Sequence, residues 1–320
     1  MQHIIITGGA GFIGSSLADQ LIAEGHRVTV IDNYDLFYDK AIKERNIASL
    51  RSHPNFKMLE LDINDLDAMR THLTDEYDVV VHVAAKAGVH ASIKTPVACQ
   101  QANVMGTQHM LEIAKEKNIK QFVFASSSSV YGVNPNVPWN EADQNMMPIS
   151  PYASSKLSCE LLGHVYAHLY NIRFIALRFF TVYGPRQRPD LAIHKFAKMI
   201  INHEPITMYG DGSSRRDYTY IDDILVGVRA AMDYQKTDFE IINLGNHRTV
   251  SLKEMISTIE EVFEEKAIIK QLPMQPGDVP QTYADISKAE RLLNYHPQLT
   301  FREGIEKFKH WMIMDKMEKK

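Results

Sequence analysis

Runs of consecutive apolar residues alternate with longer amphipathic segments over the first half of the chain. Apolar residues follow one another without a break in strands that are buried on both faces, whereas a half-exposed strand alternates apolar and polar positions. The pattern therefore predicts buried parallel strands at His3–Thr7, Arg27–Ile31, Phe56–Leu61, Val79–Val83, Gln121–Ala125 and Arg173–Arg178.

Helices are predicted between these strands, over Ser15–Glu24, Asp65–Leu73 and from Pro96 towards Asn118. Proline in the first turn of a helix and glycine or asparagine just after its end are the expected boundary signals. This regular alternation of strands and helices predicts an α/β protein with a doubly wound parallel sheet, the Rossmann type of fold.

The alternation ends near residue 180, where prolines and glycine turns become frequent. Three later helices are expected to start at capping boxes, which are Ser251 with Glu254, Ser287 with Glu290, and Thr300 with Glu303. We expect residues 1–180 to form a dinucleotide-binding domain, to which a segment near 218–250 returns. Residues 181–320 are expected to form mainly a smaller C-terminal α/β lobe for the substrate.

The composition of the 320 residues, with 45% hydrophobic and 23% charged positions, is that of an ordinary globular protein. A formal net charge of -4 gives no basic excess, so nucleic acid is not an expected partner. Cys99 and Cys159 have no CxxC spacing and predict neither a disulfide framework nor a thiolate metal site. No leader pattern and no apolar run of about 20 residues is visible, so we expect a cytoplasmic protein without a membrane span or a metal.

A glycine-rich turn follows the first predicted strand and opens the first helix, with glycines at positions 8, 11 and 14. Residues without a Cβ let backbone N–H groups approach a pyrophosphate at the positive end of a helix. A plain strand–helix turn can carry the same glycines, but Asp32 ends the second strand. A carboxylate there can accept hydrogen bonds from both ribose hydroxyls of a dinucleotide. Together, Gly8, Gly11, Gly14 and Asp32 predict a dinucleotide site.

Asp32 also bears on which dinucleotide binds. Its charge would repel the 2′-phosphate of NADP, and Asn33 follows it instead of an arginine, so NAD is the expected cofactor. Three basic residues further on are interpreted as a solvated helix face rather than a phosphate clamp, namely Lys40, Lys43 and Arg45. Asp62, after the third strand, is predicted either to meet the adenine edge or to cap the helix that follows.

Tyr152 and Lys156 are four residues apart, which places a phenol and an amine on one face of a helix predicted to begin after Pro151. A lysine cation beside a phenol is expected to lower its pKa from about 10, and the tyrosine could then take a proton from a sugar hydroxyl as hydride leaves the same carbon. Such a pair is common by chance. The serines at 126–129 strengthen the prediction because the carboxyl ends of strands bind ligands in open α/β folds. Asn103, within a helix, is expected to tie the backbone or hold a water.

With these residues the chain resembles the extended short-chain dehydrogenases, in the NAD-dependent epimerase/dehydratase group. The resemblance extends over nearly the whole chain and rests on the segments TGGAGFIG, DNY after the second strand, HVAAKAGV, SSSSVYG, PYASSK, RFFTVYGPRQRP, GDGSSRRDYTYIDD and PGDVPQTYADISKAERLLNY. It implies an enzyme that oxidises C4 of a UDP-sugar with NAD. It also implies a homodimer, because relatives commonly pair through helices like Pro96–Asn118 and Ser150–Tyr170.

The resemblance assigns roles to individual positions. Tyr152 would be the base, Lys156 its partner and Ser127 the catalytic hydroxyl, with Ser129 close by. The cofactor would contact Gly8, Gly11, Phe12, Ile13, Gly14, Asp32, Asn33, Asp62, Ile63, Ala84, Ala85, Lys86, Asn103, Tyr152 and Lys156. Lys86 stands where many relatives carry glutamine. The UDP-sugar would contact Ser127, Ser128, Ser129, Tyr152, Thr181, Arg188, Arg216, Gln275 and Asp278, with Arg216 on the pyrophosphate and Asp278 on the ribose.

The reaction within the family depends on the run Ser127-Ser128-Ser129. Dehydratases of the family look like Thr-Asp-Glu at these positions, and decarboxylases usually show a glutamate in the run. Hydroxyls alone cannot carry out the elimination of water, which needs an acid and a base. The resemblance therefore implies epimerisation at C4.

The choice of sugar depends on a second group of positions. Hexose epimerases usually carry asparagine at Thr181 and arginine at Gln275, whereas the segment with Thr181, Arg186, Arg188, Pro189 and Asp190 resembles the UDP-glucuronate 4-epimerases. A substrate carboxylate calls for a cation or a hydroxyl, so Arg188 is the first candidate and Thr181 the second. Alternatively, these arginines form salt bridges at the domain junction.

Three other functions stay open at this point, two enzymatic and one non-catalytic. One is a UDP-glucose or UDP-N-acetylglucosamine 4-epimerase, and a decarboxylase is a weaker candidate. The other class is a redox-sensing protein that binds NAD without catalysis, although such relatives have lost the tyrosine and lysine that this chain keeps. Traces of NADH formed on incubation with a UDP-sugar would distinguish an enzyme from a sensor.

Overall fold

The computed structural model describes residues 1–144, 146–273 and 279–317. A seven-stranded parallel sheet forms the centre of the molecule, in the order β10-β6-β5-β4-β1-β2-β3. The strands are β1 (His3–Thr7), β2 (Arg27–Asp32), β3 (Phe56–Glu60), β4 (Val79–His82), β5 (Gln121–Ser127), β6 (Arg173–Phe179) and β10 (Phe239–Leu244). The predicted doubly wound α/β fold is confirmed, and the predicted strands agree with the observed ones to within two residues at each end.

The expectation of fully buried strands is wrong for β3. This strand pairs with β2 and ends the sheet, and only Phe56 among its residues is buried. An edge strand has solvent beside it, so its apolar residues cover one face rather than two.

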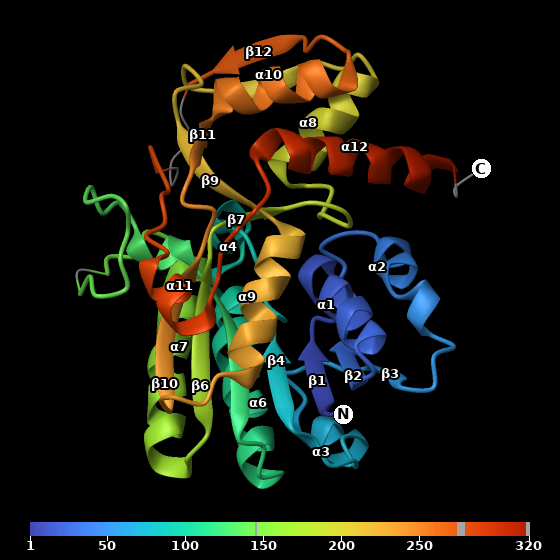
Figure 1. Cartoon of the computed structure of the whole chain (residues 1–320), viewed down its shortest axis with the longest axis vertical. Helices are drawn as coiled ribbons and strands as arrows, with labels where there is room; N and C mark the ends of the chain where they lie inside the picture. Colours follow the sequence, from blue (N-terminus) through green and yellow to red (C-terminus); the bar gives the residue numbers. More distant parts are fainter. Residues whose placement is uncertain (145, 274–278, 318–320) are drawn as a thin grey trace.

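Alternate residues of the strands build two apolar cores, one on each face of the sheet. In β1, for example, Ile4 and Ile6 join one core and Ile5 the other. The first core is covered by α1 (Phe12–Ala23) and α9 (Ile221–Asp233). The second core is covered by α3 (Leu66–His72), α6 (Gly106–Glu116) and α7 (Pro151–Tyr170). Figure 1 shows these layers.

Shorter segments connect the layers. They are α2 (Lys40–Asn46), the 3-10 turn η1 (Ala48–Leu50), α4 (Val89–Lys94), α5 (Pro96–Gln100), the π-helical turn η2 (Gln101–Met105) and the 3-10 turn η3 (Ser128–Tyr131). The helix predicted from Pro96 towards Asn118 is thus present as α5, η2 and α6 in succession. A π-helical turn inside an α-helix often marks a functional position, and this one contains Asn103.

A smaller lobe stands at the carboxyl ends of the main strands (Figure 1). It contains a three-stranded sheet of β7 (Thr181–Tyr183), β9 (Arg215–Tyr220) and β11 (Thr249–Ser251), and a pair of parallel strands, β8 (Ile206–Tyr209) and β12 (Ile269–Leu272). Its helices are α8 (Ala192–Ile201), α10 (Leu252–Phe263) and α12 (Phe301–Met317). Helix α11 (Ser287–Leu293) instead packs against β10 and α9.

Two of the three predicted capping boxes are present. Ser251 and Glu254 bond each other's backbone at the start of α10, and Thr300 and Glu303 do so before α12. The box predicted at Ser287 is wrong. The backbone N–H of Ser287 donates to the side chain of Asp285, and Ile286 is the N-cap of α11.

Two absences concern the described part of the chain only. None of its helices has the length and apolar character needed to cross a membrane. Nor do the same residues contain a group of three or more His, Cys, Asp or Glu side chains that could hold a metal ion.

Candidate active site

The glycine-rich turn lies between β1 and α1 at the carboxyl end of the sheet. Gly8 has φ +67°, and a Cβ on it would stand 2.8 Å from the backbone nitrogen of Ala84, so a larger residue does not fit. Helix α1 begins at Phe12 with Gly11 as its N-cap, and no side chain of the described residues caps it. The first N–H groups and the positive end of α1 are therefore available to an anion, which fits the pyrophosphate of NAD.

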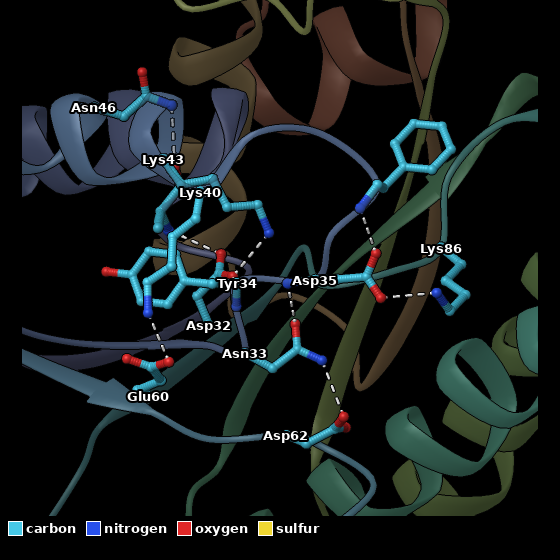
Figure 2. Close-up of polar contacts among 12 residues, drawn as sticks. Asp32, Asn33, Tyr34, Asp35, Lys40, Lys43, Asn46, Glu60, Asp62 and Lys86 are labelled. Atoms are coloured by element: carbon cyan, nitrogen blue, oxygen red, sulfur yellow. Dashed lines mark hydrogen bonds and ion pairs between the residues drawn. The ribbon is translucent and has the colours of Figure 1, made fainter.

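Asp32 lies beside this turn and is 5% exposed. Its Oδ1 accepts hydrogen bonds from the N–H of Tyr34 at 2.8 Å and from Lys43 Nζ at 3.0 Å, and its Oδ2 accepts one from the N–H of Ala10 at 3.2 Å. Figure 2 shows Lys43 pointing from α2 towards Asp32. The interpretation of Lys43 as part of a solvated helix face is wrong, because this lysine is 7% exposed and ion-paired.

The Asp32–Lys43 pair changes the argument on cofactor choice. Lys43 offsets the charge that was expected to repel a 2′-phosphate, so electrostatic exclusion of NADP is weaker than Asp32 alone implies. Asp32 can still accept a further hydrogen bond, because a carboxylate has about four lone-pair sites and three donors occupy it here. One acceptor site is left, which is enough for one ribose hydroxyl and not for the two that were expected.

Asn33 and Asp62 connect the ends of β2 and β3. Asn33 Nδ2 donates to Asp62 Oδ2 at 2.9 Å, and Asp62 Oδ1 accepts the N–H of Asn64 at 2.8 Å. The N-cap of α3 is Asp65, whose side chain accepts from the N–H of Ala68, so the alternative of Asp62 as the helix cap is wrong. Ile63, beside Asp62, is buried. The contact of Asp62 with the adenine of the cofactor therefore remains a prediction.

The segment after β4 packs against the glycine turn and is held from two sides. The N–H of Ala84 donates to Thr7 Oγ1 at 3.2 Å. Asn103, 1% exposed, accepts the N–H of Lys86 at 2.7 Å and donates to the carbonyl of Lys86 at 3.3 Å. Asn103 thus ties the backbone, one of its two predicted roles. Ala85 lies between these fixed points and is partly exposed.

Ser127, Tyr152 and Lys156 converge where β5 ends beside the start of α7. Ser127 Oγ donates to Ser129 Oγ at 3.0 Å and accepts the N–H of Ser129 at 3.2 Å, and the Ser127 side chain is close enough to the Tyr152 phenol to lower its pKa. Lys156 Nζ lies 5.9 Å from the centre of the Tyr152 ring and donates to the carbonyl of Ala125 at 2.6 Å. Ser128 is buried in η3. A hydroxyl, a phenol and an amine are therefore within one small site.

The protonation behaviour of this group differs from the expectation. Burial raises the pKa of Tyr152 above its usual value, while the Ser127 hydroxyl and the charge of Arg188 act to lower it. Burial also lowers the pKa of Lys156 to about 8. The predicted net lowering of the tyrosine pKa by Lys156 is wrong for this arrangement, because loss of solvent outweighs the favourable neighbours. The contacts that favour the phenolate come from Ser127 and Arg188.

A buried ion pair that the sequence patterns did not predict lies behind the site. Arg178 of β6 and Glu160 of α7, 2% and 1% exposed, are joined by two hydrogen bonds of 2.9 and 2.7 Å. Ser126 donates to the same carboxylate at 2.5 Å. The pair therefore fixes the end of β5, which carries Ser127, to the helix that carries Tyr152. An arginine inside a predicted buried strand was the available signal, since buried charges are normally paired.

The residues predicted for the sugar are less closely connected. Arg188 forms two hydrogen bonds with Asp190, of 3.0 and 2.8 Å, and a third with the carbonyl of Ala87 at 3.4 Å. Arg186 pairs with Asp19 of α1 at 2.5 Å. Salt bridges near the junction of the two lobes, the alternative considered for these arginines, are thus present for both.

Thr181 and Arg216 lie on the small three-stranded sheet. Thr181 begins β7 and is paired with Tyr218 of β9, the strand that also carries Arg216. Arg216 Nη1 donates to the carbonyl of Arg215 at 2.9 Å. The predicted contacts Gln275 and Asp278 lie outside the described residues.

The fold and this group of residues define a dinucleotide-dependent enzyme of the extended short-chain dehydrogenase type. A sequence profile of the family described as GDP-mannose 4,6 dehydratase matches residues 5–308, and the chain belongs to this family.

Known proteins with similar chains include several 4-epimerases. UDP-glucuronate 4-epimerase of Thermodesulfobacterium geofontis is 39% identical over 315 residues, which cover 97% of this chain and 96% of that one. The crystal structure of UDP-glucuronic acid 4-epimerase from Bacillus cereus in complex with UDP-glucuronic acid and NAD has a TM-score of 0.89 and 37% identity, covering 98% of this chain and 99% of that one. UDP-N-acetylglucosamine 4-epimerase from Methanobrevibacter ruminantium M1, in complex with UDP-N-acetylmuramic acid, has a TM-score of 0.89 and 32% identity over the same shares.

Proposed function

We propose that this protein is a UDP-glucuronate 4-epimerase, which interconverts UDP-glucuronate and UDP-galacturonate by transient oxidation at C4. The observation that carries the proposal is the position of Ser127 at the end of β5 beside Tyr152 and Lys156 of α7, with Arg188 bonded to the carbonyl of Ala87. Similarity to enzymes of that name supports it.

NAD, when bound, supplies the acceptor and donor of the C4 hydride. The glycine turn and the start of α1 would hold its pyrophosphate, and Asp32 a ribose, as described above. Tyr152 would take the proton of the 4-hydroxyl as hydride leaves and return it afterwards. Ser127, whose hydroxyl acts on the pKa of the phenol, would orient the 4-hydroxyl, and Lys156, with Nζ 5.9 Å from the ring centre, would be the cationic partner of Tyr152.

The serine run limits what can happen to the oxidised sugar. Although the family is named after a dehydratase, Ser127, Ser128 and Ser129 offer only hydroxyls, and elimination of water needs an acid and a base. The 4-keto sugar can therefore only rotate within the site and take the hydride back on its opposite face.

The carboxylate of glucuronate makes a particular demand on the site. Oxidation at C4 produces a β-keto acid, which loses CO₂ readily when the breaking bond lies parallel to the carbonyl π orbital. The guanidinium of Arg188 can hold the carboxylate out of that alignment with two parallel hydrogen bonds. Asp190 and the Ala87 carbonyl take three of its five N–H donors, so two are left for such a contact. Thr181 would bind one carboxylate oxygen from β7.

The small lobe would hold the nucleotide. We propose that Arg216 contacts the UDP pyrophosphate, because a guanidinium matches phosphate oxygens, and that Gln275 and Asp278 line the same site. Residues 1–180 with 218–250 would then form the NAD-binding domain, on which α11 packs, and most of the other residues of 181–320 would form the UDP-sugar lobe.

A homodimer is proposed from an apolar surface on the second face of the sheet. Helix α5 and the turn η2 expose Val97 and Met105 to 77% and 47%, and α7 exposes Leu161 and Leu169 to 65% and 59%. α5 and η2 pack against α7, so these side chains can belong to one interface. Analytical ultracentrifugation tests this directly, and Leu161→Glu with Leu169→Glu should give a monomer.

The proposed function is tested by incubating the protein separately with UDP-glucuronate, UDP-glucose and UDP-N-acetylglucosamine and separating the product sugars. We expect UDP-galacturonate from the first and little conversion of the other two. Conversion of UDP-N-acetylglucosamine instead would favour the second candidate, which the similarity to the Methanobrevibacter enzyme supports.

A further inference from the structure

The loops that follow β2 and β4 are joined by an ion pair that has no place in the proposed reaction. Lys86 Nζ lies 2.8 Å from Asp35 Oδ2, and the two side chains are 38% and 34% exposed. Figure 2 shows Lys86 reaching from one side of the view to meet Asp35. The pair connects residues that are 51 positions apart in the chain.

The order of the strands determines what this pair crosses. β1 lies between β4 and β2 in the sheet, and the glycine turn follows β1. A contact between the loop after β2 and the loop after β4 therefore spans the end of β1, from which the turn assigned to the pyrophosphate continues.

Both ends of the connection are fixed to the protein. The backbone of Lys86 is held on two sides by the carboxamide of Asn103. The loop after β2 is stiffened by side chains that accept the N–H two residues later, from Asn33 to Asp35 and from Asp35 to Phe37.

A second cation reaches the same two loops. The guanidinium of Arg188 lies 4.9 Å from the centre of the Phe37 ring and donates to the carbonyl of Ala87, the neighbour of Lys86. The loop after β2 is thus joined to the loop after β4 twice, by Asp35–Lys86 directly and by Phe37 through Arg188.

We propose that the Asp35–Lys86 ion pair is a strap over the dinucleotide site, which must open before NAD enters or leaves. The strap rests on the proposed binding of NAD at the glycine turn. Its role is to keep one NAD bound through many turnovers, which suits a reaction that reduces and reoxidises the same cofactor. A half-exposed pair contributes about 1 kcal/mol at most, which corresponds to about a fivefold change in the rate of opening.

The test measures how fast bound NAD is exchanged. Holoenzyme freed of excess cofactor is mixed with radiolabelled NAD, and the rates of release and of association are followed by rapid filtration. Lys86→Gln, Asp35→Asn and the double variant should each speed release about fivefold, and the double variant should be no faster than either single one. Lys57→Gln is the matched control, because Lys57 pairs with Asp75 at 3.1 Å with similar exposure of 44% and 33%. Its rates should equal those of the wild type.

Two further readings separate a strap from other roles of Lys86. A strap delays entry and exit alike, so association should quicken by a similar factor and the Kd should change little. Added NaCl should speed release from the wild type but not from the double variant. Faster release with unchanged association would make Lys86 a ligand of NAD and overturn the strap, and equal rates in all variants would overturn it as well. If the wild type binds no NAD at all, the proposed function itself fails.

Discussion

The two halves of the candidate site are built in different ways. On the cofactor side, side chains are bonded to nearby backbone, as Asp32 is to Ala10 and Tyr34, and Asn103 is to Lys86. On the sugar side, Arg188 is held chiefly by one exposed carboxylate, Asp190. Many backbone bonds hold a shape before any ligand arrives, whereas a surface ion pair contributes little and can exchange its partner. The comparison indicates a preformed cofactor site beside an adjustable sugar site.

The largest effect is expected where the halves meet. Tyr152→Phe should lower turnover by about 10²–10⁴-fold, because only the phenolic oxygen can take the C4 proton while the ring still packs. NAD content after purification should stay that of the wild type. Steady-state rates measure the turnover of this variant, and Tyr170→Phe, at the far end of the same helix, is the control. A variant that keeps more than about a tenth of the wild-type rate would make Tyr152 structural.

The cofactor side should respond strongly to loss of Asp32. Asp32→Ala should weaken NAD binding by roughly 1.5–3 kcal/mol, the contribution of a hydrogen bond to a charged group. NADP should lose less, because the freed Lys43 can approach a 2′-phosphate. Titration calorimetry with both cofactors measures this, and adding Lys43→Met should remove the difference. Equal losses for NAD and NADP in the single variant would show that Asp32 does not select the ribose.

The free energy of unfolding at acid pH should show how firmly the cofactor side is packed, because His82 is buried there. This ring is fully buried between Thr7 and Thr107, and burial lowers its pKa to about 3. The unfolded chain takes up a proton near pH 6.5 while the folded chain does not, so the free energy of unfolding falls as pH decreases from about 6.5 towards 3.

Between about pH 7 and pH 5 the wild type should lose about 2 kcal/mol more than His82→Gln, measured by urea unfolding at each pH. The same slope in both proteins would mean that His82 accepts a proton in the folded state.

The smallest effect on affinity is expected on the sugar side. Arg188→Ala should weaken the binding of UDP-glucuronate by a few kcal/mol at most. We expect a loss of about 1 kcal/mol, because Asp190 already accepts two of the hydrogen bonds of Arg188. The ratio of UDP-4-keto-pentose to UDP-galacturonate should rise in NMR product analysis. UDP-glucose, which lacks the carboxylate, and Arg186→Ala serve as controls. Unchanged affinity and product ratio would remove this role and favour the neutral-hexose epimerase.

The same contrast explains what could be predicted from the sequence. The glycine turn, Asp32 and the pair Tyr152–Lys156 are local patterns whose geometry follows from one turn or one helix. Lys43 was misjudged because α2 has only 7 residues, too short to indicate which of its faces is buried.

The pKa of Tyr152 and the Arg178–Glu160 pair depend on segments far apart in the chain, which no local pattern connects. The edge position of β3 is likewise a property of the whole sheet.

The most direct test of the proposed reaction follows the hydrogen at C4. UDP-glucuronate carrying deuterium at C4 is incubated with the purified enzyme in ordinary water without added NADH, and the products are analysed by NMR and mass spectrometry. Oxidation and return of the same hydride predict UDP-galacturonate that retains the deuterium at C4. Failure to form UDP-galacturonate, or a product whose C4 deuterium has been lost to water, would contradict the account.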